Sequence, residues 1–221
     1  EYLYGRFKPR IFKTSIVLFS IIILVPAIIK SVKADWLFTR TDTRIEAVEW
    51  IKNNIKPKTA IALDHLFFSP PLKQTAEQIK EKEAIIAKQP ELKDLKARKL
   101  GLQLKSAMNE ETYAVYYIIE GVEDVGQFLT FWPVVDNDME SLKGKGVEYV
   151  VINNMTVSEK MLAFHKKMAD SYNPAAQFSP YKNTGFRRSY DEIEFTCMPI
   201  RDKELFSRQR PGPYIVIYRI R

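Results

Sequence analysis

Residues 42–63, DTRIEAVEWIKNNIKPKTAIAL, decide the fold class of this 221-residue chain. Thr43 is followed three residues later by Glu46, which fits a capping box, and Asp42 reinforces a helix start at this point. Apolar residues then recur at near-helical spacing, at Ile45, Val48, Ile51 and Ile55. Pro57 ends the predicted helix, and TAIAL at 59–63 predicts a short buried strand. A helix, a short turn and an apolar strand are typical of an α/β unit.

Later stretches predict more strands and another helix. Strand-forming β-branched and aromatic residues fill TYAVYYII (112–119), GVEYVVIN (146–153) and GPYIVIYRI (212–220). SEKMLAFHKKMADSY (158–172) mixes apolar and polar faces and predicts a helix. Residues 172–199 are predicted to be mostly loop, with one candidate strand at Ile193–Cys197. The sum predicts a mixed α/β domain without internal repeats.

The segment before this domain is apolar enough to enter a membrane. No residue from Thr14 to Ile29 is charged, and with Ile11 and Phe12 the apolar stretch covers 19 positions, interrupted by Lys13. As a helix it would be about 28 Å long, close to the hydrocarbon thickness of a bilayer. A signal peptide would have a shorter apolar region and a small-residue cleavage site, and a core helix would have a polar face. We therefore predict a transmembrane helix over residues 11–31.

The charges around this span predict its orientation. Four basic residues precede the uncharged segment, namely Arg6, Lys8, Arg10 and Lys13. Lys30 and Lys33 follow it, offset by Asp35, and an interfacial pair of aromatic residues comes next, Trp36 and Phe38. The positive-inside tendency places residues 1–10 in the cytoplasm as a juxtamembrane segment. Residues 36–221 then form an extracytoplasmic α/β domain of a cell-membrane protein.

The distribution of charge argues against a nucleic-acid partner. The first 44 residues carry eight Lys/Arg against three acidic residues, so they account for +5 of the net charge of +7. The remaining 177 residues therefore carry only +2. A nucleic-acid-binding domain would need a basic face on its folded part. We expect no nucleic acid to bind.

Residues 73–108 differ from their surroundings, because they are rich in Lys, Glu, Gln, Ala and Leu and contain no aromatic residue. Ile79 and Ile86 lie on one apolar stripe, and a second stripe contains Leu92, Leu95 and Leu102. Pro90 suits the first turn of a second helix. We predict a helical-hairpin insertion, which serves either as a solvated structural element or as a docking arm or lid.

Few residues suggest chemistry. The sequence contains neither GxGxxG nor GxxxxGK[ST], and its single cysteine, Cys197, excludes an intrachain disulfide. The strongest local candidate is Asp64-His65 after the 59–63 strand, since ligands of α/β sheets bind at the carboxyl ends of strands. His165, the other histidine, is predicted to lie on a helix surface.

Two acidic pairs, Asp136/Asp138 and Asp191/Glu192, lack the ligand spacing of a calcium loop. No catalytic, cofactor-binding or metal-ligating residue is therefore assigned in this chain. A buried thiol is the expected state of Cys197.

The order of these features resembles the C-terminal end of the GT-C superfamily of polyprenyl-phosphate-dependent membrane glycosyltransferases, which includes protein O-mannosyltransferase-like and aminoarabinose-transferase-like enzymes. In many members the last membrane helix is followed by D-[ST]-R-x-x-A-x-x-W-I-x-x-N-I, a proline turn and an apolar strand. The matching residues are Asp42, Thr43, Arg44, Ala47, Trp50, Ile51, Asn54, Ile55, Pro57 and Ala60–Leu63. Further landmarks are Pro70-Pro71, then Val147, Tyr149, Val150 and Val151, then Gly212 to Ile220. The chain departs from the pattern at Thr59, where members usually have glycine, and in its 73–108 insertion.

The resemblance implies transfer of a sugar from a lipid-phosphate donor to an acceptor outside the cytoplasm. Family members use an acidic catalytic residue in their first extracytoplasmic loop, often with a divalent metal. That loop would precede Glu1, so the segment would hold no catalytic residue or cofactor. Its partners would be the bilayer and, through the full-length protein, the lipid-linked donor. The alternatives are a single-span interaction module that recruits a partner through 73–108, and an autonomous enzyme on an anchor.

Overall fold

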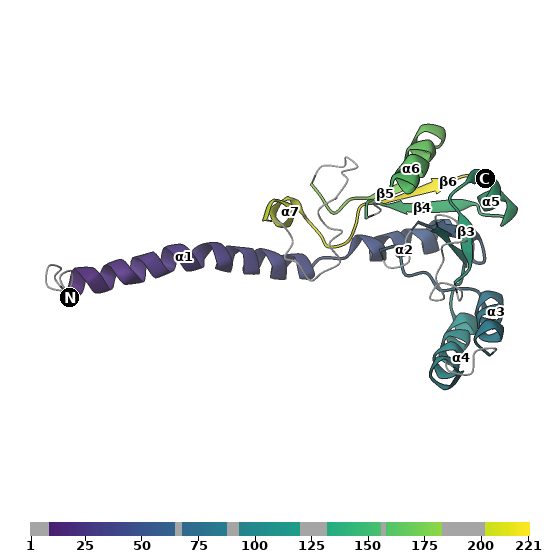
Figure 1. Ribbon diagram of the computed structural model, residues 1–221, viewed down its shortest axis with the longest axis horizontal. Coiled ribbons are helices and arrows are strands. Elements are labelled where there is room, and N and C mark those ends of the chain that lie inside the picture. Colours follow the sequence, from purple (N-terminus) through teal and green to yellow (C-terminus); the bar gives the residue numbers. More distant parts are fainter. Residues whose placement is uncertain (1–8, 65–67, 88–92, 120–131, 156–157, 183–201) are drawn as a thin grey trace.

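The computed structural model describes residues 9–64, 68–87, 93–119, 132–155, 158–182 and 202–221 (Figure 1). The helices are α1 (Pro9–Phe38), α2 (Thr43–Asn54), α3 (Ala76–Ala87), α4 (Lys93–Asn109), α5 (Met139–Gly144), α6 (Glu159–Ser171) and α7 (Asp202–Ser207). The strands are β1 (Ala60–Leu63), β2 (Ala114–Ile119), β3 (Val134–Asp136), β4 (Tyr149–Asn153), β5 (Pro174–Phe178) and β6 (Ile215–Arg219). The long apolar N-terminal helix and the mixed α/β sheet are thereby confirmed.

The strands form one sheet in the order β3-β2-β1-β4-β6-β5. β1 pairs in parallel with both β2 and β4, so that Ala62 lies opposite Tyr116 on one side and Val150 on the other. β3 extends the parallel part beside β2, while β6 runs antiparallel between β4 and β5. The chain thus builds outward from β1 in one direction and then returns to its other side with β4. This change of direction puts a topological switch point between β1 and β4.

Both faces of the sheet are covered, which explains why its central strands are continuously apolar. Ile61 and Leu63 of β1 pack on α2, in a core cluster with Ala47, Ile51 and Ile55. Ala62 points to the opposite face, where the core contains Leu142 of α5 and Met161, Phe164 and Met168 of α6. The domain is a three-layer α/β/α arrangement, with α2 on one face and α5 and α6 on the other (Figure 1).

Two sequence predictions about the sheet and its first helix were wrong. β5 lies in the stretch that was predicted to be loop, because PAAQF has little β-branched or aromatic character and is held as an edge strand by β6 alone. The predicted capping box does not form either. The N-cap of α2 is Asp42, whose side chain accepts the Arg44 N–H, and the Thr43 hydroxyl instead donates to a distant carbonyl, that of Pro213. The candidate strand at Ile193–Cys197 lies outside the described residues.

Helix α1 is 30 residues long, or about 45 Å, and extends past the predicted end at residue 31 as far as Phe38. Its apolar side chains from Ile16 to Val32 are 41–67% exposed, and none of its most apolar window is buried. A core helix of a globular protein would be covered. α1 is the one helix in the described part of the chain that is long and apolar enough to cross a bilayer.

The predicted hairpin forms from α3 and α4, which pack on each other and project from the sheet (Figure 1). Their small core contains Ile79 and Ile86 of α3, as predicted, and Leu100 of α4. Leu102, predicted to lie on the apolar stripe, is instead exposed. On α4 the residues that join this core are Leu100 and Leu104, so the prediction for Leu102 was wrong, while Leu92 lies outside the described residues.

The turn between α2 and β1 contains a strained residue. The Thr59 N–H donates to the carbonyl of Lys56, and Lys58 between them has a φ of 69°. This left-handed conformation favours glycine. The pattern that the sequence resembles has glycine at the position of Thr59. In this structure the left-handed residue is instead its neighbour Lys58, so a glycine would relieve strain there.

Lys58→Gly should therefore raise the free energy of unfolding by about 0.5–1 kcal/mol, because glycine removes the Cβ strain at a modest entropic cost. Lys56→Gly is the matched control: its φ is not in the left-handed region, so this change should lower stability by a similar amount, because glycine gives the unfolded chain more freedom. Urea unfolding of the full chain in detergent, followed by tryptophan fluorescence, measures both. Equal effects of the two variants would contradict the strained turn.

Candidate functional site

Helices α1 and α2 are separated by a break at residues 39–42, and the segment 208–213 crosses that break. We call this segment the C-terminal strap. The Thr43 N–H donates to the carbonyl of Pro211 (3.1 Å), and the Thr43 hydroxyl donates to that of Pro213 (2.7 Å). On the other side, the Lys33 ammonium of α1 donates to the carbonyl of Arg208 (3.0 Å). The strap therefore binds both helices and sets the position of α1 against the sheet domain.

Glycine is required at one position of the strap. Gly212 has a φ of 97°, and a Cβ there would overlap the Thr43 hydroxyl and the Asp42 carboxylate. Its carbonyl accepts a hydrogen bond from Nη1 of Arg208 (2.8 Å), whose burial lowers the pKa of the guanidinium. The strap thus packs directly on the first turn of α2.

The carboxylate beneath the strap is held ionised. Burial by itself would raise the pKa of Asp42, but hydrogen bonds from the Arg44 side chain and backbone N–H hold that pKa below its ordinary value. Oδ2 of Asp42 accepts from Nη2 of Arg44 (2.7 Å), and Oδ1 accepts from the Arg44 N–H (2.8 Å). Arg208 adds a favourable charge.

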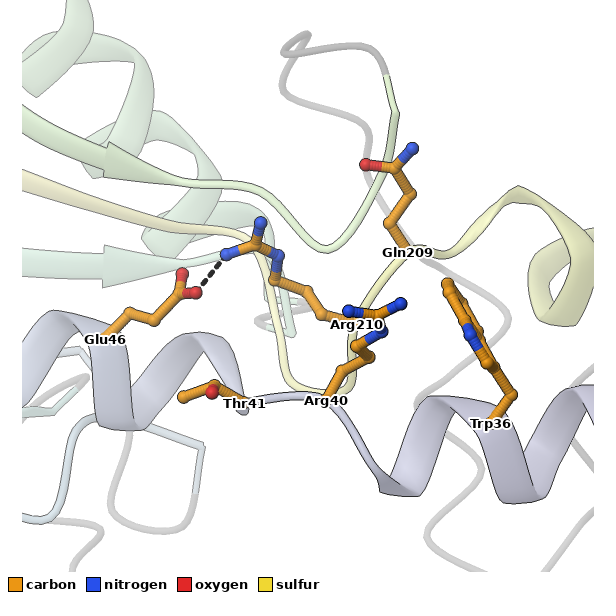
Figure 2. A pocket seen from close by; sticks show the side chains of 6 residues that line it. All are labelled: Trp36, Arg40, Thr41, Glu46, Gln209 and Arg210. Carbon is orange, nitrogen blue, oxygen red and sulfur yellow. Dashed lines mark hydrogen bonds and ion pairs between the residues drawn. The ribbon is translucent and has the colours of Figure 1, made fainter.

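A cavity of about 360 Å³ opens beside this joint. Figure 2 shows that the side chains lining it come from the end of α1, from the break, from α2 and from the strap. The lining residues are Trp36, Arg40, Thr41, Glu46, Gln209 and Arg210. The cavity is therefore formed by parts of the chain that lie at opposite ends of the sequence.

The cavity has a positive balance of charge. Arg210 is paired with Glu46, the only acidic residue in the lining. Arg40 makes no ion pair within the described part of the chain, and its guanidinium lies 4.7 Å from the centre of the Trp36 ring. The Lys33 ammonium lies 3.9 Å from the same ring centre. An anion is the kind of ligand that this arrangement favours.

A second group of polar residues gathers at the switch point of the sheet. Asp64, directly after β1, accepts hydrogen bonds from the Asn153 N–H (2.8 Å) and from the Asn153 amide at the end of β4. Nε2 of His165 on α6 lies 3.1 Å from the same carboxylate, although neither ring nitrogen makes a well-formed hydrogen bond among the described residues. The Asp64 side chain is fully buried. Its contacts join the ends of the two central strands, which is a structural role.

The candidate residues predicted from the sequence lie at different places in the fold. Asp64 lies at the predicted strand end, whereas His65 lies outside the described residues. The prediction that His165 lies on a helix surface was wrong: it is buried beside Asp64. Asp138 caps α5 by accepting the N–H groups of Glu140 and Ser141, while Asp136 ends β3. Asp191, Glu192 and Cys197 lie outside the described residues.

Among the residues that the structure describes, no group of three or more His, Cys, Asp or Glu side chains is arranged to hold a metal ion. Sequence reasoning missed the cavity altogether. The available signal was the basic pair Arg208 and Arg210 just before the Pro-Gly-Pro turn, since a basic segment followed by a rigid turn is positioned to fix charge at one place. No protein-family model, curated protein or solved structure matches this chain.

Gly212→Ala should lower the free energy of unfolding by about 2–4 kcal/mol, because the added methyl group meets Thr43 and Asp42 and the backbone disfavours it. Gly144→Ala, at the end of α5 with nothing near its Cβ, is the control and should change stability by less than about 0.5 kcal/mol. Denaturant unfolding of the full chain in detergent compares them. A Gly212→Ala protein as stable as the control would contradict the packing of the strap on α2.

Asp64→Ala should lower stability by about 2–4 kcal/mol, because it leaves the buried N–H and amide of Asn153 without an acceptor. Asp170→Ala, on the exposed face of α6, is the control and should cost less than about 0.5 kcal/mol. In a double-mutant cycle, Asn153→Ala should cost much less once Asp64 is already alanine. Additive effects in this cycle would show that the Asn153 side-chain amide does not bind Asp64.

Proposed function

We propose that this chain is the C-terminal membrane span and covering domain of a membrane glycosyltransferase, which moves a sugar from a lipid-phosphate donor to an extracytoplasmic acceptor. In this proposal α1 crosses the bilayer with its N-terminus in the cytoplasm, and the α/β domain lies outside. The segment is not catalytic by itself. The catalytic acid, with any divalent metal, belongs to a loop that precedes Glu1.

The observation that supports this proposal best is the contact between the two halves of the sequence resemblance. The D-[ST]-R stretch at Asp42–Arg44 and the G-P stretch at Gly212-Pro213 are about 170 residues apart, yet they pack on each other at the joint between α1 and the domain. The central landmarks, Ala60–Leu63 and Tyr149–Val151, are paired strands. The two halves of the resemblance are thus parts of one packed unit in this chain.

The exposure of α1 supports its insertion in a bilayer. Water would face a continuous apolar surface along the helix, at a cost of roughly 25 cal/mol for each Å² of apolar area. Beyond this surface, aromatic side chains remain exposed near the domain, with Phe38 78% exposed and Trp36 and Phe206 partly so. α7, which carries Phe206, packs beside α1 (Figure 1). Aromatic side chains at this level are typical of the membrane interface.

The layout also suggests what the domain contributes. A lipid-linked donor stays in the bilayer while its sugar lies at the surface. A domain fixed to the last span by the strap would lie over that surface, where it can exclude water and guide the acceptor. This role needs a rigid joint rather than catalytic side chains in the domain.

One observation favours a second candidate, a single-span interaction module that recruits a partner through the hairpin. The α3–α4 hairpin exposes Leu102 (65%) and Met108 (68%), which are large apolar side chains on an otherwise charged pair of helices. Exposed apolar residues of this kind mark docking surfaces in some proteins. The two candidates differ in whether the hairpin is needed for activity.

The decisive experiment uses the natural full-length polypeptide, purified in detergent and supplied with a labelled polyprenyl-phosphate sugar. We expect transfer of label to an acceptor by the intact protein, and loss of at least 90% of it when the chain is ended after Phe38. Absence of any transferase activity, or of membrane spans ahead of α1, would overturn the proposal.

Replacing residues 80–108 with a short Gly/Ser linker separates the two candidates, because it keeps the hydrogen bonds of Lys73, Thr75 and Gln78 to Tyr113 and Val115. Under the glycosyltransferase proposal the variant keeps most of the transfer activity, because the hairpin has its own small core and lies away from the strap. If the chain is instead an interaction module, the variant loses a co-purifying partner while the domain stays folded. Circular dichroism and unfolding measurements verify that the rest of the chain is intact.

A further inference from the structure

We propose that the cavity lined by Trp36, Arg40, Glu46 and Arg210 binds the phosphate group of a membrane lipid. The proposal depends on one part of the proposed function, the insertion of α1 in the bilayer, and not on sugar transfer. It follows from the charge of the cavity, from its donors, and from its depth relative to the span.

The residues that line the cavity carry more positive than negative charge, which favours an anion. Two guanidinium groups, of Arg40 and Arg210, line a space that contains a single carboxylate, that of Glu46. The carboxylate is already paired with Arg210, which leaves Arg40 without an acidic partner in the described residues. The ammonium of Lys33 lies on the same side of α1, three residues before Trp36. A bound anion would offset the mutual repulsion of these cations.

The donors are suited to phosphate oxygens. Arginine presents a planar fork of N–H groups that matches phosphate, and Arg40 is held by stacking near Trp36, so little side-chain freedom is lost when it binds. The ion pair with Glu46 holds Arg210 in place. It leaves other N–H groups of the Arg210 guanidinium available. Thr41 and Gln209 also line the cavity, and their side chains carry groups that can donate to an oxygen. Figure 2 shows Arg40 and Arg210 between Trp36 and Glu46.

The depth of the cavity places it at the outer edge of the headgroup layer. Ile22 lies at the middle of the uncharged segment 14–29, and Trp36 follows it by about 21 Å along the helix at 1.5 Å per residue. The headgroup region of a bilayer lies roughly 15–22 Å from the midplane. If α1 stands upright with its apolar segment centred, Trp36 lies at the outer part of this layer and Arg40 just beyond it. Phosphates of membrane lipids are therefore the anions nearest to the cavity.

The test uses the full chain in a phosphate-free maltoside detergent, with lipid binding measured by native mass spectrometry. The probes are phosphatidylglycerol, a polyprenyl monophosphate, the uncharged polyprenol and inorganic phosphate. We expect at least one of the two phosphate lipids to bind, with little binding of the polyprenol. Arg40→Gln should weaken that binding at least about 10-fold, because a charge-assisted hydrogen bond is lost.

Arg219→Gln is the matched control, since it removes the same charge from the distal end of β6, and it should bind like the wild type. Arg40 makes no ion pair in the described residues, and its cation–π contact is with the partly exposed Trp36 ring, so its replacement should shift the unfolding midpoint only slightly. Preference for the polyprenyl monophosphate supports the proposal with a lipid carrier as the source. Comparable binding of phosphatidylglycerol supports it with the bulk membrane as the source.

Two results would overturn the proposal. One is equal lipid binding by the Arg40→Gln and Arg219→Gln variants. The other is inorganic phosphate that binds as tightly as either lipid, which would assign the cavity to a soluble anion. Carbonate-resistant association of the chain with liposomes tests the insertion of α1 separately, and sugar transfer by the full-length protein tests the proposed function separately. Failure of one of these three measurements is therefore distinguishable from failure of the others.

Discussion

The packing of the C-terminal strap on the first turn of α2 is the constraint on which the rest of the structure depends. α1 and the sheet domain are connected in sequence only through the short break at residues 39–42, which by itself would allow many relative positions. The strap removes that freedom by hydrogen bonding to Thr43 on one side and to Lys33 on the other. Gly212 makes the close approach feasible, because any larger residue would meet Asp42 and Thr43.

Once the strap is in place, the same few residues serve both architecture and binding chemistry. Arg208 and Arg210 alternate along the strap: Arg208 is buried and holds the Gly212 carbonyl, while Arg210 pairs with Glu46 at the edge of the cavity. The cavity is therefore a by-product of the joint and not of the sheet. In many α/β proteins the ligand lies at the switch point of the sheet. Here the buried Asp64 carboxylate occupies that place and joins β1 to β4.

The parts of the fold that could be predicted were those encoded by local pattern. The periodicity around Ile51 and the apolar run at 59–63 predicted α2 and β1, and the uncharged stretch from Thr14 to Ile29 predicted the long helix. The parts that could not be predicted depend on distant partners. Thr43 and Asp42 are both good N-caps, and the choice between them is made by the Pro213 carbonyl, which is 170 residues away. β5 has a weak strand composition and forms because β6 lies beside it.

The position of β6 in the sheet has a consequence for how such a protein is made. β6 comes after every other strand in sequence, yet it lies between β4 and β5 and brings the strap with it. During synthesis, residues 208–219 therefore leave the ribosome after all the other strands of the sheet. Until then β4 has an open edge and the joint at residues 39–42 is unfastened. The sheet can therefore close around β6 only after its other strands have been synthesised, and the unpaired edge of β4 is open to wrong pairing during that interval.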